Sequence, residues 1–460
     1  MAEEARASSG DVCALASALS APEFRGARVG ALVVRARDGE VLFARDADAT
    51  FTPASNQKVL TALAALARLG PAHRFVTEVL ADAEPDAAGR VGTLVLRGGG
   101  DPALVSEEWW RLAADLRRGG LRRAGRLVLD DGAFDRERWN PTWAPVGTRA
   151  YEAPIGALQA NYGAVVIEVR PGSRAGAPVQ VAVDPPVDAL SVVVRAVTVR
   201  PGIAPGLEVS RERDPRGETI VVTGLLPEDA GVQRIARSVS DPTLYAGSVF
   251  AASLAANGIV LDERAPTSGE TPPGSVSLLE FEGPTLAETV RRLLKYSSNP
   301  IAEGLVKALG RAETARPGSW ESGTRALRRA LESLGLDLRS AVLVDGSGLS
   351  LRDRVSPRLL VAALRSARDS FDLGPELLAA LPVAGRDGTL QERASGAAGR
   401  VRAKTGTLTG VLGLSGFAQA ADGEELVFSL LVNGARTPSV RGVDGFAEAL
   451  ARCSGGGGAG

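Results

Sequence analysis

The sequence contains very little histidine and cysteine, and this scarcity excludes several kinds of active site. Its 460 residues include one histidine, His73, and two cysteines, Cys13 and Cys453. A Ser-His-Asp triad would have to take its base from His73, which follows Gly70-Pro71 and is expected to lie in a loop. Neither a histidine-rich zinc site nor one with four cysteine ligands can be built. We therefore expect an active site with no metal and no cofactor.

A charge excess and a long apolar run are also missing. Lysine and arginine together number 53 and aspartate and glutamate 54, so the net charge of −1 favours neither nucleic acid nor an anionic membrane as a partner. No apolar run approaches the roughly 18 residues that a membrane-spanning helix needs. The first six residues are acidic overall and no leucine-rich stretch follows them, so a native signal peptide is not evident.

What the sequence does contain is a serine followed three residues later by a lysine, Ser55-Asn56-Gln57-Lys58, at the start of an apolar-periodic segment. This pattern predicts a helix that begins at or near Ser55. Residues i and i+3 share a helix face, so the Lys58 amine can reach the Ser55 hydroxyl. A serine needs such a base to act as a nucleophile at neutral pH. Taken alone, however, the pattern is more often a helix cap followed by a solvated lysine.

Two later segments change this interpretation. Tyr296-Ser297-Ser298-Asn299 contains Ser-x-Asn in a predicted turn between two helices, where the turn can present polar side chains into a cleft. Ala403-Lys404-Thr405-Gly406-Thr407 contains Lys-Thr-Gly. Each motif is common alone, and the serine or asparagine of the Ser-x-Asn motif could simply cap a helix. All three in this order are the set used by penicillin-binding proteins and serine β-lactamases.

A chain of 460 residues is too long for one core, so two or three domains are expected. The two ends of the chain are predicted to form one of these domains together. The elements expected near the ends are a helix at 11–19, hairpin strands at 28–37 and 41–45, a second hairpin at 411–419 and 425–433, and a helix at 444–452. They predict an α+β catalytic domain in which helices flank an antiparallel sheet. Residues 75–266 are rich in short β-type runs and turns, which indicates β-rich domains inserted into the catalytic domain.

The chain resembles the low-molecular-mass class C penicillin-binding proteins, the D-alanyl-D-alanine carboxypeptidase/endopeptidase family known as peptidase family S13. The resemblance covers essentially the whole chain and, beyond the three motifs, includes segments at 98–102, 151–161, 345–350, 381–390 and 403–417. It implies a penicillin-binding protein/serine β-lactamase-like catalytic domain with two inserted β-rich domains. The boundaries expected are 1–74 and 280–460 for the catalytic domain, 75–172 and 263–279 for the first inserted domain, and 173–262 for the second.

The resemblance implies a role for each residue of the first two motifs. Ser55 resembles the acylated nucleophile and Lys58 the base that deprotonates it. Ser297 resembles the proton shuttle to the leaving amine, and Asn299 the group that binds the substrate amide. Lys58 can act as a base only if its pKa falls well below the usual value of about 10.4. Burial and a second nearby cation would both lower that pKa.

The third motif is implied in substrate binding. Lys404 resembles an electropositive residue beside the proton shuttle, and it could supply the cation that lowers the pKa of the base. Thr405 and Thr407 resemble ligands for the terminal carboxylate of the substrate. The backbone N–H groups of Ser55 and Thr407 resemble an oxyanion hole. On a strand edge, Gly406 would let a peptide approach the backbone and add to the sheet like an extra strand.

These features predict a serine DD-peptidase that forms an acyl-enzyme on Ser55 and is acylated by penicillins. It would cleave D-alanyl-D-alanine as a carboxypeptidase, D-Ala–meso-diamino-acid cross-links as an endopeptidase, or both. The expected partners are peptidoglycan stem peptides and β-lactams, and the expected location is periplasmic or otherwise extracytoplasmic. Two alternatives stay open, a β-lactamase or esterase of the same superfamily and a non-catalytic penicillin-binding module.

The two cysteines leave two interpretations open. In the family, the first and last helices pack side by side, which implies a disulfide between Cys13 and Cys453 in a protein that works outside the cytoplasm. The alternative is one buried small residue and one thiol at a frayed, glycine-rich end.

Overall fold

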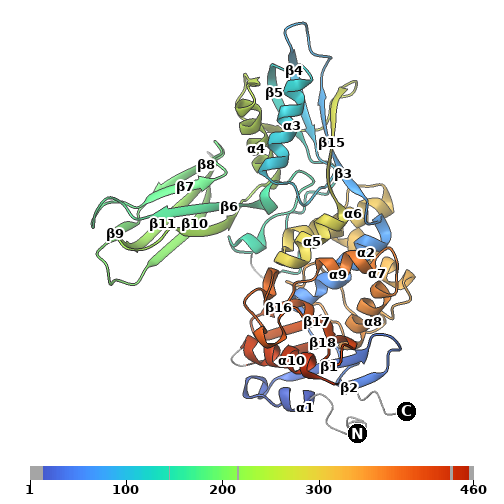
Figure 1. Ribbon diagram of the computed structural model, residues 1–460. Helices are drawn as coiled ribbons and strands as arrows, with labels where there is room; N and C mark the ends of the chain where they lie inside the picture. The colour runs from blue at the N-terminus through green and yellow to red at the C-terminus, as the bar shows by residue number, and fades with distance from the viewer. Residues whose placement is uncertain (1–13, 144–145, 215–216, 436–438, 455–460) are drawn as a thin grey trace. The chain divides into compact units, whose positions relative to one another are not determined.

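The computed structural model describes residues 14–143, 146–214, 217–435 and 439–454, which form two compact units (Figure 1). Unit 1 consists of the described residues of 1–73, 140–144 and 285–460, and unit 2 of those of 74–139 and 145–284. The chain leaves unit 1 after His73 and, apart from the short segment at 140–144, returns to it at Thr285, so an insertion separates the Ser55 motif from the two later motifs. The finer boundaries expected for two inserted domains stay predictions.

Unit 1 is built on one antiparallel sheet with the strand order β16-β17-β18-β1-β2. Its strands are β1 Arg28–Arg35, β2 Val41–Arg45, β16 Val401–Leu408, β17 Val411–Gln419 and β18 Glu425–Asn433. Both predicted hairpins are present, and β17 and β18 have the predicted bounds. β16, which carries the Lys-Thr-Gly motif, lies at one edge of the sheet.

Helices cover both faces of this sheet. They are α1 Leu15–Ala18, α2 Gln57–Leu69, α5 Leu286–Tyr296, α6 Asn299–Thr314, α7 Trp320–Ser333, α8 Pro357–Arg368, α9 Gly374–Ala380 and α10 Val440–Arg452. α1 and α10 pack on one face, where Phe446 contacts Phe428 with ring centroids 6.1 Å apart. On the other face Gly30 lies against Pro357 at the start of α8. Because both faces are covered, β1 and β18 are buried along almost their whole length.

Side-chain caps set several helix ends. Thr285 caps α5 in a capping box with Glu288, and Ser298 caps α6 immediately after the Ser297 turn. α10 begins at Val440, four residues before the predicted start, because Ser439 caps it. The part of the predicted first helix at 11–13 lies outside the described residues, and α1 is only four residues long. No helix in the described part of the chain is both long and apolar enough to cross a bilayer.

The described residues of unit 2 form three sheets and two α-helices. The largest sheet has the order β13-β5-β4-β3-β15, with β14 also paired to β5. Its elements, with the two helices, are β3 Arg74–Ala81, β4 Arg90–Arg97, β5 Arg123–Asp130, β13 Val260–Leu261, β14 Thr267–Ser268, β15 Val276–Thr285, α3 Ser106–Arg118 and α4 Pro242–Ala256. The sequence did not predict α3 or α4. α4 contains no charged residue, so it lacks the polar face that marks an amphipathic helix.

The other two sheets of unit 2 are smaller and lie in the region predicted to be rich in β-strands. One pairs β12, β6 and β7, and the other has the order β10-β11-β8 with β9 also paired to β11. Their strands are β6 Ala164–Arg170, β7 Gln180–Asp184, β8 Leu190–Val194, β9 Val197–Val199, β10 Gly206–Asp214, β11 Gly217–Pro227 and β12 Gln233–Ser238. Residues 190–199 thus form two short strands, β8 and β9.

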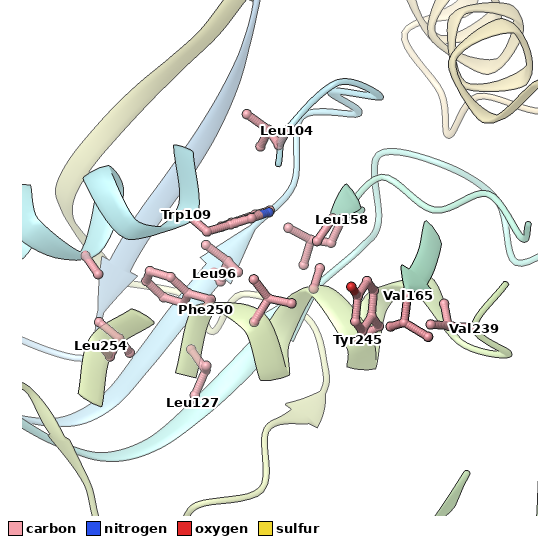
Figure 2. Packing of buried hydrophobic residues seen from close by; sticks show 14 of the residues in the cluster. Leu96, Leu104, Trp109, Leu127, Leu158, Val165, Val239, Tyr245, Phe250 and Leu254 are labelled. Atoms are coloured by element: carbon pink, nitrogen blue, oxygen red, sulfur yellow. The ribbon is translucent and has the colours of Figure 1, made fainter. Parts of the chain in front are cut away.

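One apolar core joins these elements of unit 2 (Figure 2). Trp109 of α3 packs against Phe250 of α4, with ring centroids 6.0 Å apart, above Leu96 and Leu127 of the large sheet. The same cluster continues to Val165 of β6. The insertion thus has its own core and does not depend on the catalytic sheet for its burial.

Candidate active site

Ser55 lies immediately before α2, in a 3-10 turn formed by Ala54–Asn56. Lys58 follows Ser55 by three residues, in the first turn of α2, so the two side chains lie on the same face. The turn is packed tightly, because Gly348 approaches so closely that a Cβ there would overlap the Ala54 carbonyl oxygen. Between positions 51 and 66 only Ser55 is not fully buried. This local structure holds the serine rigidly and leaves it open to a ligand.

Lys58 is fully buried, and its amine contacts three oxygen atoms. Nζ lies 2.8 Å from Ser55 Oγ, 2.7 Å from Asn299 Oδ1 and 2.8 Å from the Ser347 carbonyl oxygen. The last two atoms can only accept hydrogen bonds. A neutral amine that donates its two N–H groups to them directs its lone pair at the Ser55 hydroxyl. The contacts therefore aim a base at the proton that a serine nucleophile must lose.

The surroundings of Lys58 also favour its neutral form. Burial lowers the pKa of Lys58 from 10.5 to about 7, while the negative charges of Asp345 and Glu303 oppose the fall. A large fraction of the amine is therefore uncharged at neutral pH and able to accept a proton. The sequence required such a lowered pKa, and the geometry supplies it chiefly through burial.

The Ser-x-Asn motif occupies the turn between α5 and α6. Ser297 ends α5 with a φ of 57°, a left-handed conformation that is unusual for a residue other than glycine. Ser298 caps α6, and Asn299 is the first residue of that helix and is bonded to Lys58. The predicted polar turn is thus present, and it brings the second motif against the first.

Lys404 lies on the edge strand β16 and is fully buried, with Nζ donating to the Thr405 carbonyl oxygen at 2.7 Å. Burial lowers the pKa of Lys404 well below its usual value, and the positive charges of Lys58 and Arg393 lower it further. The sequence-based expectation was that Lys404 would lower the pKa of Lys58. Burial is instead the largest cause at Lys58, and the repulsion between the two lysines is felt at Lys404.

Thr405 is oriented by a neighbouring turn. Its Oγ1 donates to Thr389 Oγ1 at 2.8 Å, and Thr389 lies in the 3-10 turn Gly388–Leu390. Asp387, just before that turn, accepts hydrogen bonds from Lys295 Nζ at 2.7 and 2.6 Å. Lys295 belongs to α5, the helix that ends at the Ser-x-Asn turn, so this ion pair ties the second motif to the third. Thr407, also on β16, is exposed.

The model of the D-Ala-D-Ala carboxypeptidase 3 (S13) family matches residues 12–450 of this chain. The chain belongs to this family. It is 37% identical to a D-alanyl-D-alanine carboxypeptidase of Actinomadura sp. (strain R39), over 95% of this chain and 84% of the relative. It is 27% identical to the D-alanyl-D-alanine carboxypeptidase DacB of Haemophilus influenzae, over 90% of this chain and 86% of that protein.

A solved structure agrees with the family fold. The crystal structure of penicillin-binding protein 4 (dacB) from Haemophilus influenzae matches with a TM-score of 0.82 and 24% sequence identity, covering 95% of this chain and 98% of that one. The prediction of a penicillin-binding protein-like α+β fold with inserted domains is therefore confirmed.

Gly406 of this S13 protein lies close against the turn that carries the nucleophile. A Cβ at Gly406 would lie 2.6 Å from Asn56 Nδ2 and 2.9 Å from the Pro53 carbonyl oxygen. A Cβ at Gly413, the partner of Gly406 on β17, would also overlap the Asn56 side chain. The missing side chain thus makes space for the turn that carries the nucleophile. The expectation that Gly406 also lets a peptide approach the backbone stays a prediction.

Sequence reasoning missed a group of buried acids next to Lys58. Asp345 accepts hydrogen bonds from Trp143 Nε1 at 2.9 Å and from the backbone N–H groups of Gly348 and Ser350 at 2.6 and 2.7 Å. Glu303 of α6 is fully buried as well. An acid within the apolar run Ile301-Ala302-Glu303-Gly304-Leu305-Val306 was a signal that could have identified it.

Proposed function

We propose that this S13-family protein is a serine DD-peptidase that acts through an acyl-enzyme on Ser55. The observation that carries the proposal is the buried Lys58 amine, whose other two contacts direct its lone pair at the Ser55 hydroxyl. The family membership and the 37% identical D-alanyl-D-alanine carboxypeptidase support the same reaction class. The activity is that of a serine-type carboxypeptidase, with D-Ala-D-Ala peptides as substrates.

In the acylation step, neutral Lys58 takes the proton from Ser55 Oγ, and Oγ attacks the carbonyl carbon of the penultimate D-alanine. The backbone N–H groups of Ser55 and Thr407 would hold the oxygen that becomes negative. The C–N bond then breaks, and the leaving amine of the terminal D-alanine receives a proton through Ser297. Water cleaves the resulting ester, releasing the shortened peptide as a carboxylate and restoring the Ser55 hydroxyl.

Recognition of the terminal carboxylate is assigned to the edge strand. Lys404 supplies a positive charge, and the exposed Thr407 supplies a hydroxyl donor. Thr405 lies on the same side of β16 as Thr407 and would turn its hydroxyl from Thr389 to the carboxylate. A carboxylate bound at Lys404 raises the pKa of its amine, because an opposite charge favours the charged form. Asn299, already bonded to Lys58, is placed to bind a substrate amide.

The proposed partners are peptidoglycan stem peptides, with β-lactams as covalent inhibitors, and the proposed location is outside the cytoplasm. A structure of the Haemophilus influenzae protein in complex with a β-lactam supports the choice of inhibitor class. Cys453 is disulfide-bonded, which fits an oxidising compartment. Cys13, the only other cysteine, lies outside the described residues.

Intact mass after exposure to benzylpenicillin tests the proposal, with Ser55→Ala as the matched variant. The wild type should gain one penicilloyl group and also release D-alanine from a D-Ala-D-Ala peptide, and the variant should do neither while retaining its fold. A labelled Ser55→Ala protein would remove Ser55 as the nucleophile. Rapid repeated hydrolysis of penicillin would favour a β-lactamase, and labelling without release of D-alanine would favour a binding module.

A further inference from the structure

The proposed mechanism makes no use of Glu303, although this acid is fully buried beside the site. Glu303 follows Asn299 by four residues on α6, so the two side chains share one face of the helix. A buried carboxylate is costly unless it is paired or hydrogen-bonded. The hydrogen-bond partners of Glu303 therefore indicate which part of the site it stabilises.

Those contacts connect Glu303 to the base through one peptide segment. Oε1 accepts the backbone N–H groups of Gly346 and Ser347, at 3.1 and 2.8 Å, and Oε2 accepts Trp320 Nε1 at 2.6 Å. The carbonyl oxygen of the same Ser347 accepts a hydrogen bond from Lys58 Nζ. The carboxylate thus holds the backbone N–H of Ser347, the residue whose own carbonyl group orients the amine.

Several charged groups face Glu303. Lys58 comes from α2, Lys307 follows it by one turn on α6 with Nζ 3.9 Å from the Trp320 ring centre, and Asp345 and Asp353 come from the loop that contains Ser347. Burial and the charge of Asp345 raise the pKa of Glu303, whereas the hydrogen bonds that it accepts from Ser347 and Trp320 lower that pKa and favour the ionised form. Burial followed by Asp345 raises the pKa of Asp353. The negative charges of Asp345 and Glu303 in turn favour the protonated form of Lys58.

We propose that Glu303 is a positioning residue for the Lys58 base, holding the Ser347 carbonyl against the amine and stabilising the ammonium that forms when Lys58 accepts the Ser55 proton. The inference rests on the proposed function. Its physical logic is that of a buried carboxylate that orients a base and stabilises its protonated form in other serine hydrolases. Here the carboxylate acts through the backbone of Ser347 rather than through a direct contact.

A purely structural role for Glu303 makes a different prediction. If the acid only holds the 345–350 loop in place, its replacement lowers thermal stability and the amount of active protein. It then leaves the rate per active site and its pH dependence unchanged. The two roles are separated by the pH profile of acylation, normalised to the sites that penicillin titrates.

The variant for this test is Glu303→Gln, which keeps the side-chain shape and removes the charge. The second-order rate constant of acylation by a fluorescent penicillin is measured between pH 5.5 and 9. We expect it to fall about 10-fold to 100-fold, the range typical of groups that act through a neighbour of the reacting atom. The acid limb should also move to lower pH, because a charge that favours protonated Lys58 is gone. Leu309→Val, a buried change on the same helix, is the matched control and should alter stability alone.

A rate within twofold of the Leu309→Val control, or an acid limb at the wild-type pH, would overturn the assignment. Should Glu303→Gln fail to fold, Glu303→Asp gives the test, because it keeps the charge but withdraws the carboxylate from the Ser347 peptide. That variant should acylate about tenfold more slowly with its acid limb unmoved, and a wild-type rate would again overturn the proposal. Failure of the wild type to label at all would instead refute the proposed function.

Discussion

The lowered pKa of Lys58 predicts how acylation depends on pH. A fall from 10.5 to about 7 corresponds to roughly 5 kcal/mol in the balance between charged and neutral amine. At pH 7.4 an amine with a pKa of about 7 is about 70% neutral, whereas one with the usual pKa would be about 0.1% neutral. Burial thus raises the supply of active base by almost three orders of magnitude.

The direction of the pH dependence follows from the role of the amine. Only neutral Lys58 can take the Ser55 proton, so the acylation rate should rise as pH increases through about 7 and level off above about 8. The assay is the second-order rate constant of penicilloylation from pH 5.5 to 9, with circular dichroism at each pH to confirm that the fold is intact. The Lys58→Ala variant should be acylated several orders of magnitude more slowly, and its rate should no longer rise with pH through about 7.

A profile that is flat from pH 6 to 9, or one that still rises tenfold per pH unit at pH 9, would refute this reasoning. The first result would mean that Lys58 is not the group that limits acylation. The second would mean that water or a counter-charge reaches the amine and cancels the effect of burial. Near-normal acylation by Lys58→Ala would show that another base acts.

Two further substitutions test the edge strand. Thr389→Val removes the hydroxyl that accepts from Thr405 and should raise KM for D-Ala-D-Ala peptides with little change in kcat, and an unchanged KM would exclude this support of the carboxylate site. Gly406→Ala places a Cβ 2.6 Å from Asn56 Nδ2 and should destabilise the protein by about 1–3 kcal/mol, measured by thermal unfolding. Gly445→Ala, where a Cβ meets open space, is its control, and equal unfolding temperatures for the two would contradict the steric argument.

The three motifs could be predicted from the sequence because their chemistry depends on local spacing. Ser55 and Lys58 are three residues apart, and Ser297 and Asn299 lie in one turn, so local structure alone brings each pair together. The two hairpins of unit 1 were predictable for the same reason, since Asp-Gly turns lie between strand-like runs. Family resemblance then supplied what spacing cannot, the meeting of three distant segments.

Glu303 and Asp345 were not predicted because their roles depend on burial. Glu303 and Lys307 are an acid and a base four residues apart, a pattern that normally indicates a solvated pair on a helix surface. Both are buried, because α6 is covered on all sides along 299–310. The α4 helix was missed for a related reason, since a helix that is apolar all round has no periodicity to detect.

In the proposed mechanism the two buried lysines of the site have opposite charge states, with Lys58 neutral as a base and Lys404 charged when it holds a carboxylate. The positive charge of Lys58 lowers the pKa of Lys404, and such coupling is reciprocal. Without a ligand this coupling favours neutral Lys404. A bound carboxylate would supply the negative charge that lets Lys404 take up a proton, and because the two added charges cancel, Lys58 could stay neutral and act as the base.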